Sequence, residues 1–324
     1  MRVRQAREDD VGAVTAFTRD TWAEFDAGDY VPDVFAEWVA TDGPDQRTVV
    51  AERGGEVVGV CQVVLLSAHE AWTQGIRVHP DHRGSGVGRA LNDACFEWAR
   101  DRGATVCRNM VFSWNEQGMA TSRSLGYDAR AEFRWAVPEP ESDLDADPDS
   151  DGGGVDADPD AGGSDGTPAD GEFEVVDDPD GAWAYWQRSE ARDALGGLGL
   201  DLDESWALSE RTRERFRRAA EETALLAVRG GGGTRGVAYL AREDAPDDES
   251  GPTAVYGAAG WADRPAADAL FDAVERDAAD RGAEGARVLI PETPRHVSDA
   301  AAVGVALDDD PDFVFEADLS GRGQ

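Results

Sequence analysis

Apolar and polar positions follow two spacings in the first 137 residues, one typical of strands and one typical of helices. Alternating or continuous apolar segments predict strands over 2–6, 48–52, 57–66, 71–78, 106–112 and 131–137. Helical spacing predicts a helix after Asp10 and further helices over 32–39, 89–102 and 116–124. This order predicts an α/β domain in which helices flank a mixed sheet.

The second half of the chain repeats the first. Residues 90–104 and 269–283 share nine identities in fifteen positions, and the strand-pair segment 50–59 is echoed by 226–236. A repeat of this length is too long for a solenoid unit and predicts two domains of one fold.

An acidic segment separates the two halves. Residues 138–171 contain twelve acidic residues and no basic one. Such a segment has little apolar surface to bury, so we expect a disordered acidic linker. The expected domains are therefore 1–137 and 172–320.

Charge sets the conditions under which this chain folds. It has 67 acidic residues, and all 31 basic residues are arginine, which gives a net charge of −36. Repulsion on this scale is tolerable when concentrated salt shortens the Debye length. The composition is typical of a cytosolic protein of an extreme halophile such as a haloarchaeon, and it disfavours a nucleic-acid partner.

Other composition signals are weak. No apolar run approaches the roughly 18 residues of a membrane span, so we expect a soluble cytoplasmic protein without a membrane partner. The three cysteines, Cys61, Cys95 and Cys107, have no paired spacing, and the four histidines are scattered. We therefore expect neither disulfides nor a metal, and read these thiols as core residues.

A glycine-rich segment is the strongest chemical signal. Residues 83–88, Arg-Gly-Ser-Gly-Val-Gly, connect the predicted strand 71–78 to the predicted helix 89–102. A helix start of this kind leaves backbone N–H groups without intrachain partners, and they suit a diphosphate. In the repeat, Ala262, Pro265 and Ala267 replace the arginine and two glycines. Because proline has no backbone N–H to donate to a phosphate, we expect the second domain to bind no phosphate-containing cofactor.

The segment 75–88 and the later Asn115, Gly126 and Tyr127 resemble the GNAT superfamily of acetyl-CoA-dependent N-acetyltransferases. The superfamily's motifs read V-x-P-x-x-R-G-x-G-x-G and N-x-x-A-x-x-[L]-Y-x-x-x-G-[FY]; Gly118 and Ser122 depart from the small Ala and the Tyr of the second. The resemblance implies that acetyl-CoA binds to Ile76, Val78, Arg83, Gly84, Ser85, Gly86, Val87, Gly88 and Asn115.

The resemblance also implies a direct attack of an amine on the thioester. The Val78 N–H would polarise the acetyl oxygen. Asn115 would bond the pantetheine arm or order a water, or would only cap its helix. Glu70, which shares the alternation of Val78 along one strand, would take the amine proton through water, although a surface glutamate at a strand start is the alternative. Ser122 would reprotonate the thiolate, although its hydroxyl reaches less far than that of a tyrosine; the alternatives are that water does so or that the enzyme needs no dedicated acid.

The acceptor side is expected between Trp22 and Trp38. There Asp29, Tyr30 and Trp38 would recognise a cationic amine by charge and cation–π contact, although core packing explains the two aromatic residues equally well. This segment loosely resembles vertebrate histidine N-acetyltransferases, which favours a small amino-acid-like amine. The alternatives are a protein N-acetyltransferase and a non-catalytic acyl-CoA sensor. The sequence leaves the acceptor and the oligomeric state open.

Overall fold

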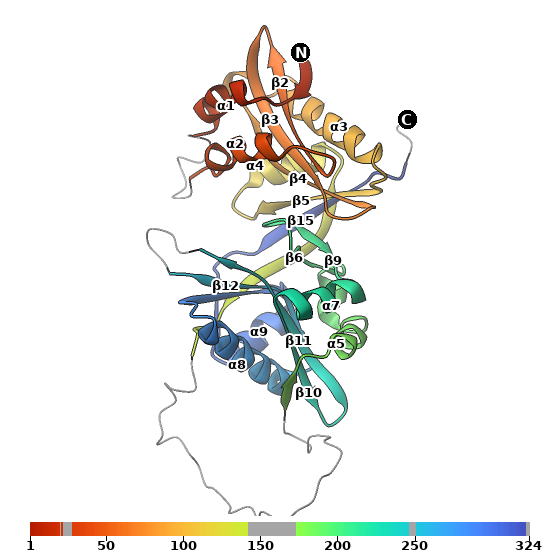
Figure 1. Ribbon diagram of the computed structural model, residues 1–324, viewed down its shortest axis with the longest axis vertical. Coiled ribbons are helices and arrows are strands. Elements are labelled where there is room, and N and C mark those ends of the chain that lie inside the picture. Colours follow the sequence, from red (N-terminus) through yellow and green to blue (C-terminus); the bar gives the residue numbers. More distant parts are fainter. Residues whose placement is uncertain (20, 22–27, 142–172, 246–250, 322–324) are drawn as a thin grey trace, which may run out of the picture. The chain divides into compact units, whose positions relative to one another are not determined.

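The computed structural model describes residues 1–19, 21, 28–141, 173–245 and 251–321 (Figure 1). They form a mixed α/β fold that divides into two compact units. Unit 1 comprises Met1–Arg130 and Phe313–Gln324, and unit 2 comprises Ala131–Asp312. Residues 142–171 of the expected linker lie outside the described residues. In the part of the chain that is described, no helix is long and apolar enough to cross a membrane.

Unit 1 is built on a mixed sheet with the strand order β1-β2-β3-β4-β5-β15. The first four strands pair in antiparallel fashion, and β4 pairs with β5 in parallel. The strands are β1 (Arg2–Gln5), β2 (Gln46–Arg53), β3 (Glu56–Leu65), β4 (Glu70–Val78), β5 (Val106–Phe112) and β15 (Asp312–Asp318). The helices are η1 (Glu8–Asp10), α1 (Val11–Thr18), α2 (Val31–Thr41), η2 (Pro80–His82), α3 (Val87–Arg100) and α4 (Glu116–Ser124).

Two apolar clusters cover the opposite faces of this sheet. On one face, α3 places Leu91 and Cys95 against Cys61 and Val63 of β3. On the other face, α1 and α2 pack with the neighbouring position Val60. Successive side chains of a strand point to opposite faces, so this division follows from the apolar content of both faces of β3.

The last strand of the chain belongs to unit 1. Phe315, Ala317 and Leu319 are buried in the unit 1 core, and the Leu319 N–H donates to the Thr105 carbonyl at 2.8 Å. Conversely, the second half of β6 (Asp128–Val137) extends into unit 2, where residues 133–136 pair with β13 (Gly285–Pro291). The unit boundaries at 130 and 312 therefore differ from the expected 137 and 320. Most of the last strand expected in each domain, β6 or β15, belongs to the other unit.

Strand β4 carries a bulge at Gly75. Val60 pairs with Arg77 and Gln62 with Gln74, so β4 has one residue more than β3 over this interval. Gly75 has a φ of +62°, a conformation that glycine adopts at little cost. The extra residue reverses the alternation: Ile76 and Val78 pack against the α3-side cluster, while Gln74 lies on the opposite face with Gln62.

Unit 2 has the strand order β6-β13-β12-β11-β10-β7. Its other strands are β7 (Glu174–Val176), β8 (Leu198–Leu200), β9 (Leu208–Glu210), β10 (Ala224–Gly230), β11 (Gly233–Asp244), β12 (Thr253–Trp261) and β14 (Ala306–Leu307), with β8 and β9 in a separate ladder. Its helices are α5 (Pro179–Trp186), α6 (Glu190–Ala194), α7 (Arg213–Glu222), α8 (Arg264–Asp280) and α9 (Pro294–Ala302). The order β11-β12-α8-β13-α9 matches β3-β4-α3-β5-α4 of unit 1.

Candidate active site

The glycine loop of unit 1 leads from β4 through η2 into α3. Gly84 and Gly86 have φ of +69° and +83°. A Cβ at either position would meet nothing within 4 Å, so these positions require glycine for the backbone conformation and not for space. Gly86 is the N-cap residue of α3, and no side chain caps this helix start. The first N–H groups of α3, on Val87 and Gly88, are therefore suited to an anion.

Neighbouring side chains hold the loop in place. The Ser85 hydroxyl donates to the His82 carbonyl at 2.6 Å, and Arg53 donates to Ser85 Oγ at 3.2 Å. The Arg83 Nε is 3.4 Å from the Val78 carbonyl. The Val87 side chain is buried in the core, so only its backbone is available to a ligand.

The strands β4 and β5 separate along their length, and the interval between their unpaired ends is here called the cleft. Their parallel pairing ends at Trp72 and Arg108, although both strands continue. A Cβ on Gly88 would lie 3.8 Å from Val78 and 4.0 Å from Ile76, so the helix start and these expected cofactor positions are neighbours. The His79 N–H donates to Val58 of β3 at 3.0 Å. Because successive N–H groups of a strand point to opposite edges, the Val78 N–H points toward the cleft.

Asn115 caps α4. Its Oδ1 accepts from the Gly118 N–H at 2.8 Å, as the helix-cap alternative predicts. A Cβ on Gly118 would lie 2.5 Å from Asn115 Nδ2, which explains why glycine stands where the family has alanine. A contact of Asn115 with pantetheine stays a prediction.

Ser122 lies on α4, and its side chain is buried. Its Oγ accepts from Asn109 Nδ2 at 3.3 Å. Asn109 Oδ1 is buried and has no hydrogen-bond partner among the described residues. Asn109 follows Arg108 at the point where β5 leaves β4. Sequence reasoning did not select Asn109, because a single asparagine inside an apolar strand carries no recognisable motif.

Glu70 is buried, which is a correction to its expected surface alternative. Its carboxylate accepts from Arg108 at 2.7 Å and from the Ser67 hydroxyl at 3.0 Å. Arg108 also donates to Glu316 of β15 at 2.7 Å. The shared alternation of Glu70 and Val78 is also wrong, because the Gly75 bulge puts them on opposite faces. A carboxylate held in a buried ion pair is better suited to structure than to proton transfer.

The three expected acceptor residues lie together, but Asp29 is already engaged. Arg77 donates to both carboxylate oxygens of Asp29, at 2.8 and 3.1 Å, and the Asp29 side chain is fully buried. The rings of Tyr30 and Trp38 meet edge to face at 6.1 Å. Tyr30 is 40% exposed, whereas Trp38 packs on Gly75. Residues 22–27 of the expected acceptor segment lie outside the described residues.

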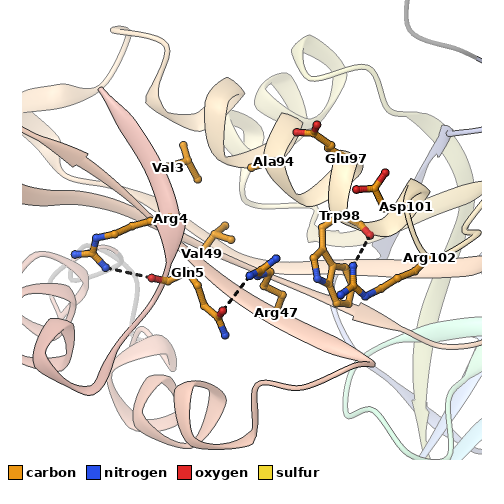
Figure 2. A pocket seen from close by; sticks show the side chains of 10 residues that line it. All are labelled: Val3, Arg4, Gln5, Arg47, Val49, Ala94, Glu97, Trp98, Asp101 and Arg102. Carbon is orange, nitrogen blue, oxygen red and sulfur yellow. Dashed lines mark hydrogen bonds between the residues drawn. The ribbon is translucent and has the colours of Figure 1, made fainter.

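A shallow hollow of about 310 Å³ lies between β1, β2 and the second half of α3 (Figure 2). Arg102 stacks over the Trp98 ring at 4.0 Å on one side, and Arg47 donates to Gln5 on the other. Its lining residues are Val3, Arg4, Gln5, Arg47, Val49, Ala94, Glu97, Trp98, Asp101 and Arg102. None of them belongs to the glycine loop or to the acceptor group, so the hollow is separate from the candidate site.

The corresponding helix start in unit 2, that of α8, has a side-chain cap and is therefore less suited to an anion. Asp263 caps α8 by accepting from the Ala266 N–H at 3.1 Å, and Pro265 stands in the first turn. The parallel pairing of β12 with β13 likewise ends before the strands do, after Tyr256 and Val288. Trp261, the last residue of β12, and His296 of α9 are buried, with their rings 4.9 Å apart.

The described residues contain no group of three or more side chains suited to a metal ion. Cys61, Cys95 and Cys107 are buried free thiols, as expected. Burial raises the pKa of Cys107 to about 12, so this thiol is protonated at neutral pH and inert.

The family likeness of unit 1 rests on its sequence together with its fold. Residues 14–127 match the model of the Acetyltransferase (GNAT) family, and unit 1 carries a GNAT acetyltransferase domain.

Two curated relatives are similar to part of this chain. The thialysine N-epsilon-acetyltransferase of Bos taurus is 28% identical over 140 residues, 38% of this chain and 82% of the relative. The histidine N-acetyltransferase of Xenopus tropicalis is 32% identical over 79 residues, 24% of each chain. The crystal structure of a GCN5-related N-acetyltransferase from Sphaerobacter thermophilus covers 100% of this chain and 97% of its own, with a TM-score of 0.57 at 15% identity. This last likeness shows the fold alone.

Proposed function

We propose that unit 1 transfers the acetyl group of acetyl-CoA to a primary amine of a small molecule by direct attack. The observation that carries the proposal is the uncapped start of α3 at Gly86, next to the cleft between β4 and β5. Its backbone donors suit the diphosphate of coenzyme A, and the cleft beside Ile76 and Val78 suits the pantetheine arm.

The chain's own groups have limited chemical tasks in this reaction. When bound, acetyl-CoA supplies the acetyl group as a thioester. The Val78 N–H stabilises the negative charge on the carbonyl oxygen while the new C–N bond forms and the C–S bond breaks. Since Glu70 is held by Arg108, we assign the amine proton to solvent water. Ser122, which accepts from Asn109, stands at the position of the family's tyrosine and offers a hydroxyl for reprotonation of the thiolate.

We further propose that unit 2 is a degenerate copy that binds no cofactor. The Asp263 carboxylate accepts the Ala266 N–H, Pro265 has no N–H to donate, and the negative charge of Asp263 repels an anion. We assign the buried rings of Trp261 and His296 to the interval that corresponds to the cleft of unit 1. Each chain therefore binds one acetyl-CoA.

The names of the two curated relatives favour an acceptor of one chemical class. Thialysine and histidine are both free amino acids with a basic side chain, and each is named as the substrate of its enzyme. We propose an amino-acid-like amine for this protein. From its charge, we also propose a cytoplasmic protein of a salt-rich cell without nucleic-acid or membrane partners.

An amine panel tests the function. Wild-type protein in molar KCl is incubated with acetyl-CoA and with free amino acids, polyamines or lysate proteins, and thiol release is measured. Turnover with a small amine supports the proposal. Turnover with proteins alone indicates a protein N-acetyltransferase, and calorimetric binding without turnover indicates an acyl-CoA sensor. Two equivalent binding sites per chain would contradict the inactive state of unit 2.

A further inference from the structure

We infer that Asp29 and Arg77 form a positioning pair that fastens α2 to the bulge of β4 and so fixes the geometry of the acetyl site. The inference rests on the function proposed above. It assigns Asp29 a task other than binding the acceptor amine.

The bulge directs Arg77 to the acceptor side of the sheet. Arg77 pairs with Val60, whose side chain belongs to the cluster under α1 and α2. Without the extra residue at Gly75, Arg77 would lie on the α3 face. The next residue is Val78, whose N–H points into the cleft. A displacement of Arg77 is therefore transmitted directly to the group that polarises the acetyl oxygen.

One carboxylate joins the helix and the strand. Asp29 accepts from Arg77 Nε at 2.8 Å and from Arg77 Nη2 at 3.1 Å, and it also accepts from the Val31 N–H at the start of α2 at 3.0 Å. The Asp29 side chain is fully buried, and the Arg77 side chain is 10% exposed. A two-pronged guanidinium–carboxylate contact fixes orientation as well as distance. Arg77 Nη1 additionally donates to the Ile76 carbonyl at 3.1 Å, which stiffens the strand beside the cleft.

A second contact presses α2 onto the same bulge. A Cβ on Gly75 would lie 2.5 Å from Trp38 Cη2, so the indole rests directly on the strand backbone. The Tyr30 ring, at the beginning of α2, lies 5.6 Å from the Arg77 guanidinium. The bulge is thus in contact with both ends of α2, through Tyr30 at the beginning of the helix and Trp38 toward its end. Polarisation of an acetyl oxygen by a backbone donor requires such a fixed position.

The test compares Asp29→Asn with wild type in molar KCl. We expect kcat to fall roughly ten- to a hundredfold, because a small misplacement of a reacting group has effects of this size. The affinity for acetyl-CoA, measured by calorimetry, should remain unchanged, since the glycine loop is not touched. The carbonyl stretching band of bound, carbonyl-labelled acetyl-CoA should move back toward the frequency of the free thioester. This band reports positioning without any acceptor.

Two further variants separate positioning from stability. The double variant Asp29→Asn/Arg77→Met leaves no buried charge unpaired, so it should regain stability but not kcat. The matched control is Asp10→Asn. Asp10 also accepts twice from one arginine, Arg4, at 2.8 Å each, and also receives a backbone N–H at a helix start, but this pair lies at β1, away from the cleft. It should lose stability with unchanged kcat.

The outcomes are distinct. Wild-type kcat and an unshifted carbonyl band in folded Asp29→Asn overturn the positioning pair, and so does a double variant that regains kcat with its stability. If Asp29→Asn does not fold, the double variant decides. Failure of wild-type protein to bind acetyl-CoA overturns the proposed function and the inference together, whereas binding and a shifted band without amine turnover overturn only the proposed transferase function.

Discussion

Two helix starts show how one residue type decides whether an anion site exists. Gly86 begins α3 with a backbone of positive φ and offers no side-chain acceptor. Asp263 begins α8 with an extended backbone and caps its own helix. The two helices are otherwise equivalent, since each follows a strand pair and covers the same face of its sheet. The helix-start donors are therefore available in unit 1 and satisfied in unit 2.

Gly86→Asp should convert the first arrangement toward the second. Aspartate tolerates positive φ better than most residues, so the fold should persist. Its carboxylate would repel the diphosphate, and the loss of one charge-assisted hydrogen bond costs on the order of 1.5–3 kcal/mol, a ten- to more than hundredfold loss of acetyl-CoA affinity. Calorimetry measures this. Asp263→Ser is the control and should leave both affinity and stoichiometry unchanged; wild-type affinity in folded Gly86→Asp would refute the loop assignment.

His296 gives unit 2 a pH dependence. Burial, with Arg295 nearby, lowers the pKa of His296 from 6.5 to about 4, while Glu190 and Asp299 oppose this shift. Between these values the unfolded chain binds a proton that the folded chain does not. Stability should therefore fall as the pH drops from 6.5 toward 4, by up to roughly 3 kcal/mol.

The variant His296→Asn isolates this contribution. Asparagine can still bond to Thr293, which contacts the His296 Nδ1 at 2.7 Å, but it does not titrate. Burial raises the pKa of Asp312 to about 7, which makes stability fall with rising pH over an overlapping range. The contribution of Asp312 is the same in wild type and in His296→Asn, so it cancels when their stabilities are subtracted. Denaturant melts at several pH values in molar KCl should show a smaller acid loss in the variant; parallel curves would contradict the assignment.

At the scale of elements, local sequence patterns were sufficient to predict individual helices and strands, but they did not predict which strands pair. The expected segments 106–112 and 116–124 coincide with β5 and α4, because apolar spacing and an asparagine cap are local signals. The bulge at Gly75 was missed, since one glycine in a strand does not reveal that the alternation reverses there. That omission put Glu70 on the wrong face. The sequence did not predict that β15 joins unit 1 and that most of β6 joins unit 2, because tertiary packing, and not local pattern, selects a strand's partner.

Because β15 belongs to the core of unit 1, we expect that unit 1 does not fold without the end of the chain. A chain ending at 311 would expose the side chains against which Phe315 and Leu319 pack, at a cost of about 3–6 kcal/mol, and Arg108 would lose Glu316. This approaches the stability of a whole domain. The thermal transition of unit 1 and acetyl-CoA binding should both be lost, while the transition of unit 2 should remain, and an added peptide of residues 305–324 should restore binding. Removal of 322–324 alone is the control. A truncated chain with wild-type affinity would contradict this assignment of β15.

At the scale of the whole molecule, net charge is the dominant feature. The 67 carboxylates exceed the 31 guanidinium groups by 36, so many carboxylates have no arginine to pair with. Exposed pairs such as Arg213–Asp180 contribute little to stability, because water surrounds both groups, and salt weakens them further. Salt equally weakens the repulsion among the excess carboxylates. Because the unpaired charges are in the majority, relief of repulsion should outweigh the loss of ion pairs.

Stability should therefore increase with KCl concentration. We expect the protein to lose its cooperative melt in low-salt buffer and to regain it in molar KCl, where the Debye length falls to about 3 Å. Circular dichroism melts across a KCl series measure this. An equally concentrated neutral osmolyte is the control for excluded-solute effects, and it should stabilise less because it screens no charge. A melting temperature that is the same in low and molar salt would show that ion pairs, and not repulsion, govern the folded state.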